Sequence, residues 1–135
     1  METYDKKRYC LALDLKNDPK KIQAYIDHHK NVWPEIKESI KNAGINQLEI
    51  FHTHNRLFMI IEGNKDFSLQ KKSKMDSENP FVQKWEEIMW EYQKSLPNTK
   101  KGTKWVLMEK IYDLDKSFIK TQPQGGKDTR GSHES

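Results

Sequence analysis

The chain has 135 residues, which fits one compact domain, because a single hydrophobic core normally serves roughly 100 to 200 residues. Hydrophobic residues make up 34% and charged residues 33%, but four Trp, five Tyr and five Phe supply apolar surface that a disordered polyelectrolyte lacks. The net charge of +4 comes from Lys and acidic residues that are interspersed along the chain, which argues against a nucleic-acid partner. No apolar run approaches the roughly 20 residues that span a bilayer, and no signal-peptide core begins the chain. We therefore expect a folded, cytoplasmic protein without membrane contact.

The first part of the chain predicts a central strand followed by two helices. Arg8 to Leu15 is apolar on both faces for most of its length, and its Cys10, the single cysteine, is expected to be a small packed residue. Residues 17–19, Asn-Asp-Pro, supply helix-start chemistry. Pro34 then restarts the helix, and a second apolar stripe continues to Gly44.

The second part predicts a β-hairpin, two helices and a closing strand. The hairpin has a short His-Asn turn, and Asn79-Pro80 is typical of a helix start. The expected elements are strands Gln47 to Thr53 and Arg56 to Gly63, a short polar helix from Phe67, a helix from Pro80 to Pro97, and a strand from Lys104 to Leu114.

This order of strands and helices is βαββαβ, which predicts a ferredoxin-like α+β fold. Its four-stranded antiparallel sheet would carry the helices on one face. Residues 1–116 are expected to form this domain. Residues 117–135 are expected to form a disordered tail, because they are rich in Gly, Gln, Ser, Thr and charges.

The sheet has apolar side chains for two faces, whereas the helices cover only one. Sheet-to-sheet contact in a homodimer would bury the other face. The residues that turn away from the helices are either Phe51, Phe58 and Ile60 or the alternate set Ile50, Met59 and Ile61.

Residues 25–35 hold the most informative side chains. Tyr25, His29 and Trp33 are spaced four apart, so a phenol, an imidazole and an indole share one helix face. His28 points about 100° away. A histidine on an apolar stripe is more often a core residue than a catalyst. A titratable ring beside a phenol and a flat indole, however, also suits the floor of a sugar pocket.

Other chemistry is weakly supported. His52 and His54 flank the hairpin turn without further spaced ligands, so no metal site is expected. There is no Gly-rich phosphate loop and no Gly-x-Ser-x-Gly motif. Trp85 suits the core stripe of its helix, whereas Trp90 lies opposite that stripe and needs either a subunit or a loop as its partner.

Several segments together resemble the L-rhamnose mutarotase family. They are Tyr25-x3-His29-x3-Trp33-Pro-Glu, the hairpin stretch Asn55-Arg-Leu-Phe-Met, the Trp85 helix and the strand Lys104-Trp-Val-Leu-Met-Glu-Lys. The match spans about residues 7 to 114. It implies a dimeric α+β barrel that interconverts the anomers of a deoxy sugar, an isomerase without any cofactor.

The resemblance also implies roles for individual residues. His29 stands where the family places its proton donor, and Tyr25 where a substrate-binding tyrosine sits. The sequence departs from the family at two positions. Leu48 stands where the family's rhamnose enzymes have a tyrosine, and Trp85-Glu86 stands where they have a Trp-Trp pair. These changes affect which sugar hydroxyls are paired. L-Rhamnose is slightly favoured as the substrate, with L-fucose as the alternative.

The expected mechanism needs only proton transfers. An imidazole that titrates near neutral pH serves as acid and base for ring opening and closure, so His29 is the predicted catalyst, with Tyr25 assisting. Trp33 or Trp85 would stack on the apolar face of the sugar. The alternatives are a non-enzymatic dimeric module that binds a small ligand, and a cofactor-free oxygenase.

Overall fold

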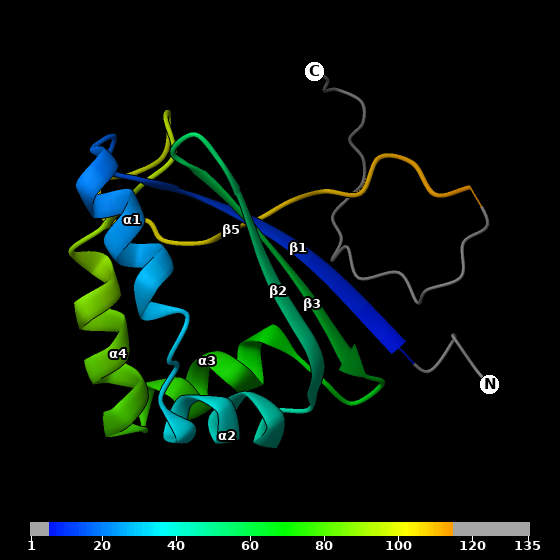
Figure 1. The fold of residues 1–135 in the computed structure, drawn as a ribbon. Coiled ribbons are helices and arrows are strands. Elements are labelled where there is room, and N and C mark those ends of the chain that lie inside the picture. Colours follow the sequence, from blue (N-terminus) through cyan, green and yellow to red (C-terminus); the bar gives the residue numbers. More distant parts are fainter. Residues whose placement is uncertain (1–5, 115–135) are drawn as a thin grey trace.

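Helices lie against one face of an antiparallel sheet in the computed structural model, which describes residues 6–114 (Figure 1). The strand order is β2-β3-β1-β4, and β5 also pairs with β1. This architecture confirms the predicted ferredoxin-like α+β class. The expected tail, residues 117–135, lies outside the described residues. In chain order the elements are β1 Lys6–Leu15, α1 Pro19–His28, α2 Pro34–Asn42, β2 Ile45–Thr53, β3 Arg56–Asn64, α3 Leu69–Ser77, α4 Pro80–Trp90, β4 Gln93–Lys94 and β5 Val106–Leu107.

Helices α1, α2 and α4 begin at the residues that the sequence marked, whereas α3 begins at Leu69, two residues after the expected Phe67, with Ser68 as its cap. Asp18 caps α1 by accepting a hydrogen bond from the backbone N–H of Lys20, and Asn79 caps α4 in the same way. Proline occupies the first turn of α1, α2 and α4, where its missing N–H costs nothing. Gly44 follows α2 with φ +96, a left-handed conformation that glycine adopts without strain.

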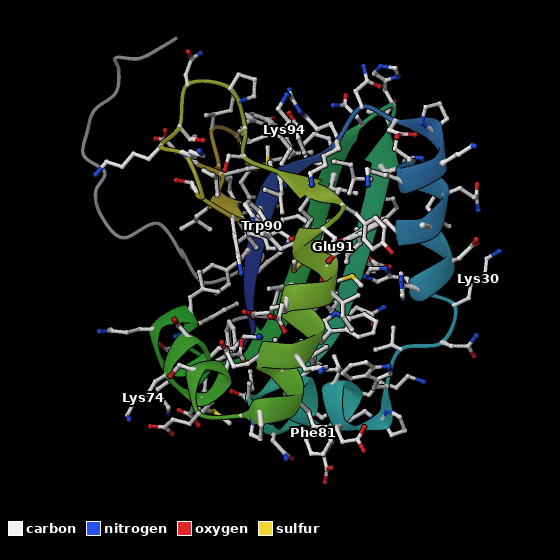
Figure 2. All side chains as sticks on the ribbon, turned by 90° about the vertical axis from the view of Figure 1, so that its left-hand side faces the viewer. Lys30, Lys74, Phe81, Trp90, Glu91 and Lys94 are labelled. Carbon is white, nitrogen blue, oxygen red and sulfur yellow. The ribbon has the colours of Figure 1, made fainter. Side chains whose placement is uncertain are left out.

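Strand β1 is the central strand, as predicted. It pairs antiparallel with β3 from Lys6 opposite Asn64 to Asp14 opposite Arg56. Side chains alternate between the two faces of a strand, so one set faces the helices. In β1 this set is Leu11, Leu13 and Leu15, which are all buried in the core. Helix α4 packs along this face, with the exposed Phe81 near its beginning and Trp90 at its end (Figure 2).

The opposite face of the sheet is largely open. Phe51 is 53% exposed and stands opposite the half-buried Phe58, while Ile60 stands opposite Cys10. Of the two sets that the sequence left open, Phe51, Phe58 and Ile60 therefore turn away from the helices. Cys10 lies half-buried on this open face and not in the core, because alternation along β1 places it there.

Two expected elements are shorter than predicted. Helix α4 ends at Trp90 and does not reach Pro97, because the following backbone pairs with the end of β1. The expected strand 104–114 is reduced to β5, Val106–Leu107 (Figure 1). The backbone N–H of Met108 still donates to the carbonyl oxygen of Cys10 in β1 at 2.7 Å, and residues 109–114 form no strand. The edge beside β1 is thus shared by two short strands, since β4 pairs with Asp14 and Leu15 and β5 with Leu11 and Ala12.

Candidate functional site

The carboxyl-terminal end of α1 brings two of the predicted residues together. Tyr25 lies in the last turns of the helix, and His29 is its C-cap. Their ring centroids are 4.5 Å apart. Tyr25 is buried, with 4% of its surface exposed, whereas His29 is half-buried. The spacing of four residues therefore places the phenol and the imidazole side by side, as the sequence predicted.

The tautomer of the neutral His29 ring follows from one hydrogen bond. Its Nδ1 lies 2.8 Å from the backbone carbonyl oxygen of Tyr25. A carbonyl oxygen only accepts, so Nδ1 carries the proton and donates it. In the neutral ring Nε2 then has a free lone pair. The hydrogen bond thus fixes the tautomer in which Nε2 is the basic atom.

Burial favours this neutral form. Desolvation lowers the pKa of His29 below its ordinary value of 6.5, although the bond to the Tyr25 carbonyl opposes the shift, and charge on His28 lowers the pKa further. At neutral pH the ring is therefore uncharged, and its Nε2 is able to take a proton.

His29 and Tyr25 line a cavity of about 640 Å³ between the helices and the sheet. Cavities of this size are typical of small-molecule sites. The sheet contributes apolar side chains, among them Leu48 and Met59, and α4 contributes Trp85 and Glu86. Five of the six predicted site residues therefore meet in one cavity: Tyr25, His29, Leu48, Trp85 and Glu86.

Trp33 does not line this cavity. It is the residue before α2, and its ring packs edge-on against Trp85 with the centroids 5.2 Å apart. The ring of His29 also meets Trp85 at its edge, at 5.7 Å. Trp85 is thus held between two neighbours, so Trp33 supports the cavity wall and does not form it.

Gln93 is a cavity residue that sequence reasoning missed. Its side-chain Nε2 donates a hydrogen bond of 3.3 Å to the phenol oxygen of Tyr25. Burial raises the pKa of Tyr25 to about 12, and the bond from Gln93 opposes this rise. The phenol therefore stays protonated at neutral pH. Residue 93 was expected within a helix that reached Pro97, and no local pattern marked it as a partner of Tyr25.

Glu86 and Lys104 form a polar pair on the cavity wall. Glu86 Oε1 lies 3.8 Å from Lys104 Nζ, and the two side chains are 40% and 45% exposed. An exposed pair at this distance contributes little to stability. The carboxylate is consequently able to exchange this partner for a ligand hydroxyl.

His28 faces away from the cavity, as the helical spacing predicted. Its Nε2 lies 3.3 Å from the hydroxyl oxygen of Tyr92, and it is not among the residues that line the cavity. The ring of His28 also packs edge-on against Trp85, with the centroids 6.3 Å apart, so both half-buried histidines contact Trp85 whereas only His29 lines the cavity.

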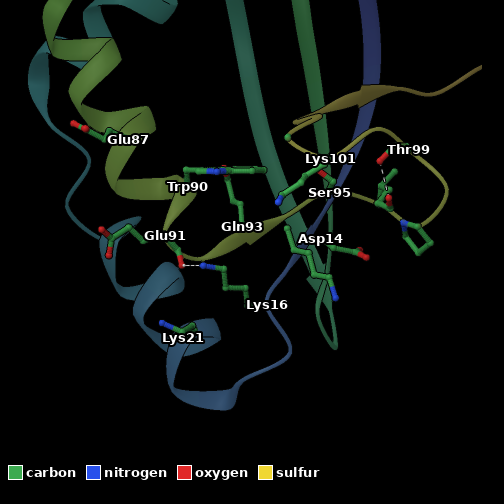
Figure 3. A pocket seen from close by; sticks show the side chains of 14 residues that line it. Asp14, Lys16, Lys21, Glu87, Trp90, Glu91, Gln93, Ser95, Thr99 and Lys101 are labelled. Atoms are coloured by element: carbon green, nitrogen blue, oxygen red, sulfur yellow. Dashed lines mark hydrogen bonds between the residues drawn. The ribbon is translucent and has the colours of Figure 1, made fainter.

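Trp90 lines a second hollow of about 890 Å³ at the end of α4 (Figure 3). Residues of the loop between Ser95 and Gly102 form part of its wall, so Trp90 and the loop border the same hollow. The ammonium group of Lys104 also lies 5.6 Å from the ring centroid of Trp90.

Metal-ligand residues do not gather in the described part of the chain. Within residues 6–114, no three or more His, Cys, Asp or Glu side chains come together at a distance that suits a metal ion. His52 and His54 are exposed at the hairpin. Over the same residues, no helix is both long and apolar enough to cross a membrane.

A sequence model of the L-rhamnose mutarotase family matches residues 8–114. The chain belongs to this family. It is 38% identical over 112 residues to the L-fucose mutarotase of Xanthomonas campestris, which covers 82% of this chain and 90% of that protein. It is 32% identical over 84 residues to the L-rhamnose mutarotase of Formosa agariphila, which covers 58% of this chain and 74% of that protein. The crystal structure of L-rhamnose mutarotase FA22100 from Formosa agariphila superposes with a TM-score of 0.60 at 23% identity, covering 81% and 99% of the two chains.

Family membership makes this protein an isomerase that interconverts sugar anomers. The resemblance seen in the sequence is confirmed, and an enzyme is favoured over a non-enzymatic binding module. The solved structure, at this identity, supports the fold alone. The cavity that holds Tyr25 and His29 combines an apolar floor with a few polar groups, an arrangement typical of small-molecule sites.

Proposed function

We propose that this mutarotase acts on a 6-deoxy-L-hexose, with L-fucose as the preferred sugar and L-rhamnose as the second candidate. The observation that carries this proposal is the basic Nε2 of a neutral His29 beside the protonated hydroxyl of Tyr25 in one cavity. One sugar ring presents both an anomeric hydroxyl and a ring oxygen, so it offers partners to both groups at once.

The preference for L-fucose rests on the comparisons and revises the slight preference for L-rhamnose that the sequence indicated. The relative named an L-fucose mutarotase is 38% identical over 82% of this chain, whereas the L-rhamnose mutarotase of Formosa agariphila is 32% identical over 58%. Leu48 and Glu86, the two departures from the rhamnose pattern, both line the cavity. These positions are therefore where a different ring configuration would be accommodated.

The proposed reaction begins with proton removal by His29. Its Nε2 takes the proton of the anomeric hydroxyl, the bond between C1 and the ring oxygen breaks, and an aldehyde forms at C1. The imidazolium then gives its proton to the former ring oxygen. Rotation about C1–C2 and the same steps in reverse close the ring as the other anomer. No atom is gained or lost, and a positioned acid-base group typically contributes about 10²- to 10⁴-fold.

Tyr25 has a different proposed role, because its raised pKa of about 12 keeps it protonated. It donates a hydrogen bond to the ring oxygen as negative charge develops there. Hydrogen bonds aimed at developing charge lower the barrier without transferring a proton. Trp85 supplies an apolar wall, and Leu48 and Met59 provide a surface for the 6-methyl group.

We also propose that the protein is a homodimer, formed through the open face of the sheet. The exposed Phe51 and the half-buried Phe58 and Ile60 form an apolar patch there. Ion pairs flank this patch at both ends, Arg8 with Glu62 and Arg56 with Asp14. Apolar centres with charged rims are typical of protein interfaces.

Anomer exchange on a panel of four sugars tests the function. Saturation-transfer NMR measures the exchange rates of L-fucose, L-rhamnose, L-galactose and L-mannose with and without the protein. L-Galactose and L-mannose add a 6-hydroxyl to the first two sugars, so they separate recognition of the methyl group from recognition of the ring. We expect acceleration of the 6-deoxy sugars, by up to about 100-fold more than of their 6-hydroxyl analogues. Equal rates with and without protein for all four would refute the proposal.

Glu86→Gln tests the choice of ring configuration. A hydrogen bond to a charged group is worth about 1.5 to 3 kcal/mol, or about 10- to 150-fold. If Glu86 pairs with a hydroxyl of one sugar alone, the ratio of the L-fucose and L-rhamnose rates shifts toward the other sugar. Glu87→Gln on the exposed side of α4 is the matched control, because Glu87 does not line the cavity. An unchanged ratio in Glu86→Gln would remove this carboxylate from sugar recognition.

A further inference from the structure

Gln93 is one of two buried polar side chains among the described residues, the other being Asp14. Asp14 is fully engaged, because the guanidinium of Arg56 donates two hydrogen bonds to its carboxylate. Gln93, with 6% of its surface exposed, has a single side-chain hydrogen bond within residues 6–114, the one to Tyr25. A buried amide costs free energy unless its groups are paired, so its position calls for an explanation.

The sheet holds Gln93 firmly in place. Its backbone lies opposite Leu15 in the short pairing of β4 with β1. Beside this pair, the backbone N–H of Lys16, which follows Leu15, donates to the carbonyl oxygen of Tyr92, which precedes Gln93, at 2.8 Å. Alternation along β4 turns Gln93 inward and leaves Lys94 exposed. Gln93 therefore lines both the cavity that holds Tyr25 and His29 and the hollow beside Trp90, and Figure 3 shows it in the second of these.

The contact between Gln93 and Tyr25 has a direction. The amide nitrogen only donates, so the phenol oxygen accepts at 3.3 Å. The phenol proton is then free for another acceptor, and within residues 6–114 no protein group accepts it. Tyr25 lines the cavity, so its phenol proton is available to an acceptor in that space.

We propose that Gln93 is a positioning residue that orients the O–H bond of Tyr25 toward the sugar. This inference rests on the function proposed above and names one determinant of its site. By occupying the phenol oxygen, the amide makes Tyr25 a donor to the ring oxygen and keeps it from accepting from a sugar hydroxyl.

Two substitutions separate this role from simple packing. In Gln93→Glu the carboxylate keeps the shape of the amide but only accepts, so the phenol turns its proton to residue 93 and away from the sugar. In Gln93→Met the shape is kept without any hydrogen bond. Gln23→Glu and Gln23→Met are the matched controls, because Gln23 is exposed on α1 and outside the cavity.

We expect Gln93→Met to lower kcat/KM for L-fucose by about 2- to 10-fold, the effect of one neutral hydrogen bond. At about pH 8, Gln93→Glu lowers it by about 10- to 100-fold, mainly through kcat, because an opposing acceptor replaces the donor. Burial raises the pKa of a carboxyl group, so protonation at about pH 5 restores a donor to residue 93. The rate of Gln93→Glu relative to wild type therefore rises as the pH falls, while both Gln23 variants keep the wild-type rate.

A second measurement does not depend on turnover. The side-chain NH₂ signals of Gln93 in ¹⁵N NMR spectra, assigned by their loss in Gln93→Met, shift in Tyr25→Phe, where the acceptor is missing. They also shift when L-fucose is added to the wild type. Circular dichroism melting shows that each variant is folded.

The possible outcomes distinguish the two proposals. No acceleration by the wild type would refute the proposed function, and NH₂ signals unmoved by L-fucose and by Tyr25→Phe would then refute the role of Gln93 as well. Acceleration by the wild type, with Gln93→Glu equal to Gln93→Met at every pH, would leave the function intact and overturn the role of Gln93.

Discussion

Replacing His29 by Asn tests the centre of the proposed mechanism. The amide of Asn keeps a hydrogen-bond donor near the carbonyl of Tyr25, which His29 Nδ1 contacts at 2.8 Å, but it does not take up a proton at neutral pH. The loss of an acid-base group predicts a fall in kcat of about 10²- to 10⁴-fold, or about 3 to 5 kcal/mol of transition-state stabilisation.

His28→Asn is the matched control, because it removes a neighbouring imidazole of similar burial. His28 has a contact of 3.3 Å with the hydroxyl of Tyr92, and losing one such bond costs about 0.5 to 1.5 kcal/mol of folding stability. His29→Asn keeps a donor for the carbonyl of Tyr25 but loses the ring contacts with Tyr25 and Trp85, which are worth a similar amount. The two variants should therefore unfold at similar urea concentrations while differing greatly in catalysis.

Saturation-transfer NMR with L-fucose at about pH 8 measures both variants against the wild type. At this pH the ring of His29 is neutral in the wild type, because burial lowers its pKa below the ordinary value of 6.5. If His29→Asn and His28→Asn exchanged anomers at the same rate, the assignment of Nε2 of His29 as the base would be wrong. A comparable loss in both, with equal loss of secondary structure, would point to folding as the cause.

The remaining predictions concern pH, assembly and packing. Burial lowers the pKa of His29 below its ordinary value of 6.5, and the neutral ring is the proposed base. We therefore expect kcat/KM to be retained as the pH falls to 6.5 and to be lost only at lower pH. A midpoint above 6.5 in the pH profile of kcat/KM would contradict this assignment. Phe51→Lys places a charge in the apolar patch of the open face and should convert the proposed dimer to a monomer, as measured by light scattering. A wild-type monomer at micromolar concentration would refute the dimer itself. Gly63→Ala would bring a Cβ atom within 2.7 Å of the Phe67 side chain, so we expect a loss of about 1 to 3 kcal/mol in urea unfolding, and a stability equal to the wild type would show that Phe67 moves freely.

Local chemistry in the sequence determined where the helices begin and which residues share a face. Asp18 and Asn79 cap helices with their own side chains, and prolines begin them, so neighbours along the chain decide these boundaries. The meeting of Tyr25 and His29 was likewise predictable, because a separation of four residues on a helix fixes their relation without help from the rest of the chain.

The tertiary structure decided the features that depend on distant segments. The stripe on α4 continued in the sequence beyond Trp90, but pairing with the end of β1 stopped the helix there. That same pairing brings Gln93 to Tyr25, 68 positions earlier in the chain. Trp33, which shares the spacing of Tyr25 and His29, was turned against Trp85 once α1 ended and α2 began. Strand pairing decided which face of the sheet stays open and which polar group contacts the phenol of Tyr25. Each strand takes its neighbours from elements that are far away in the sequence, so these features could not be predicted locally.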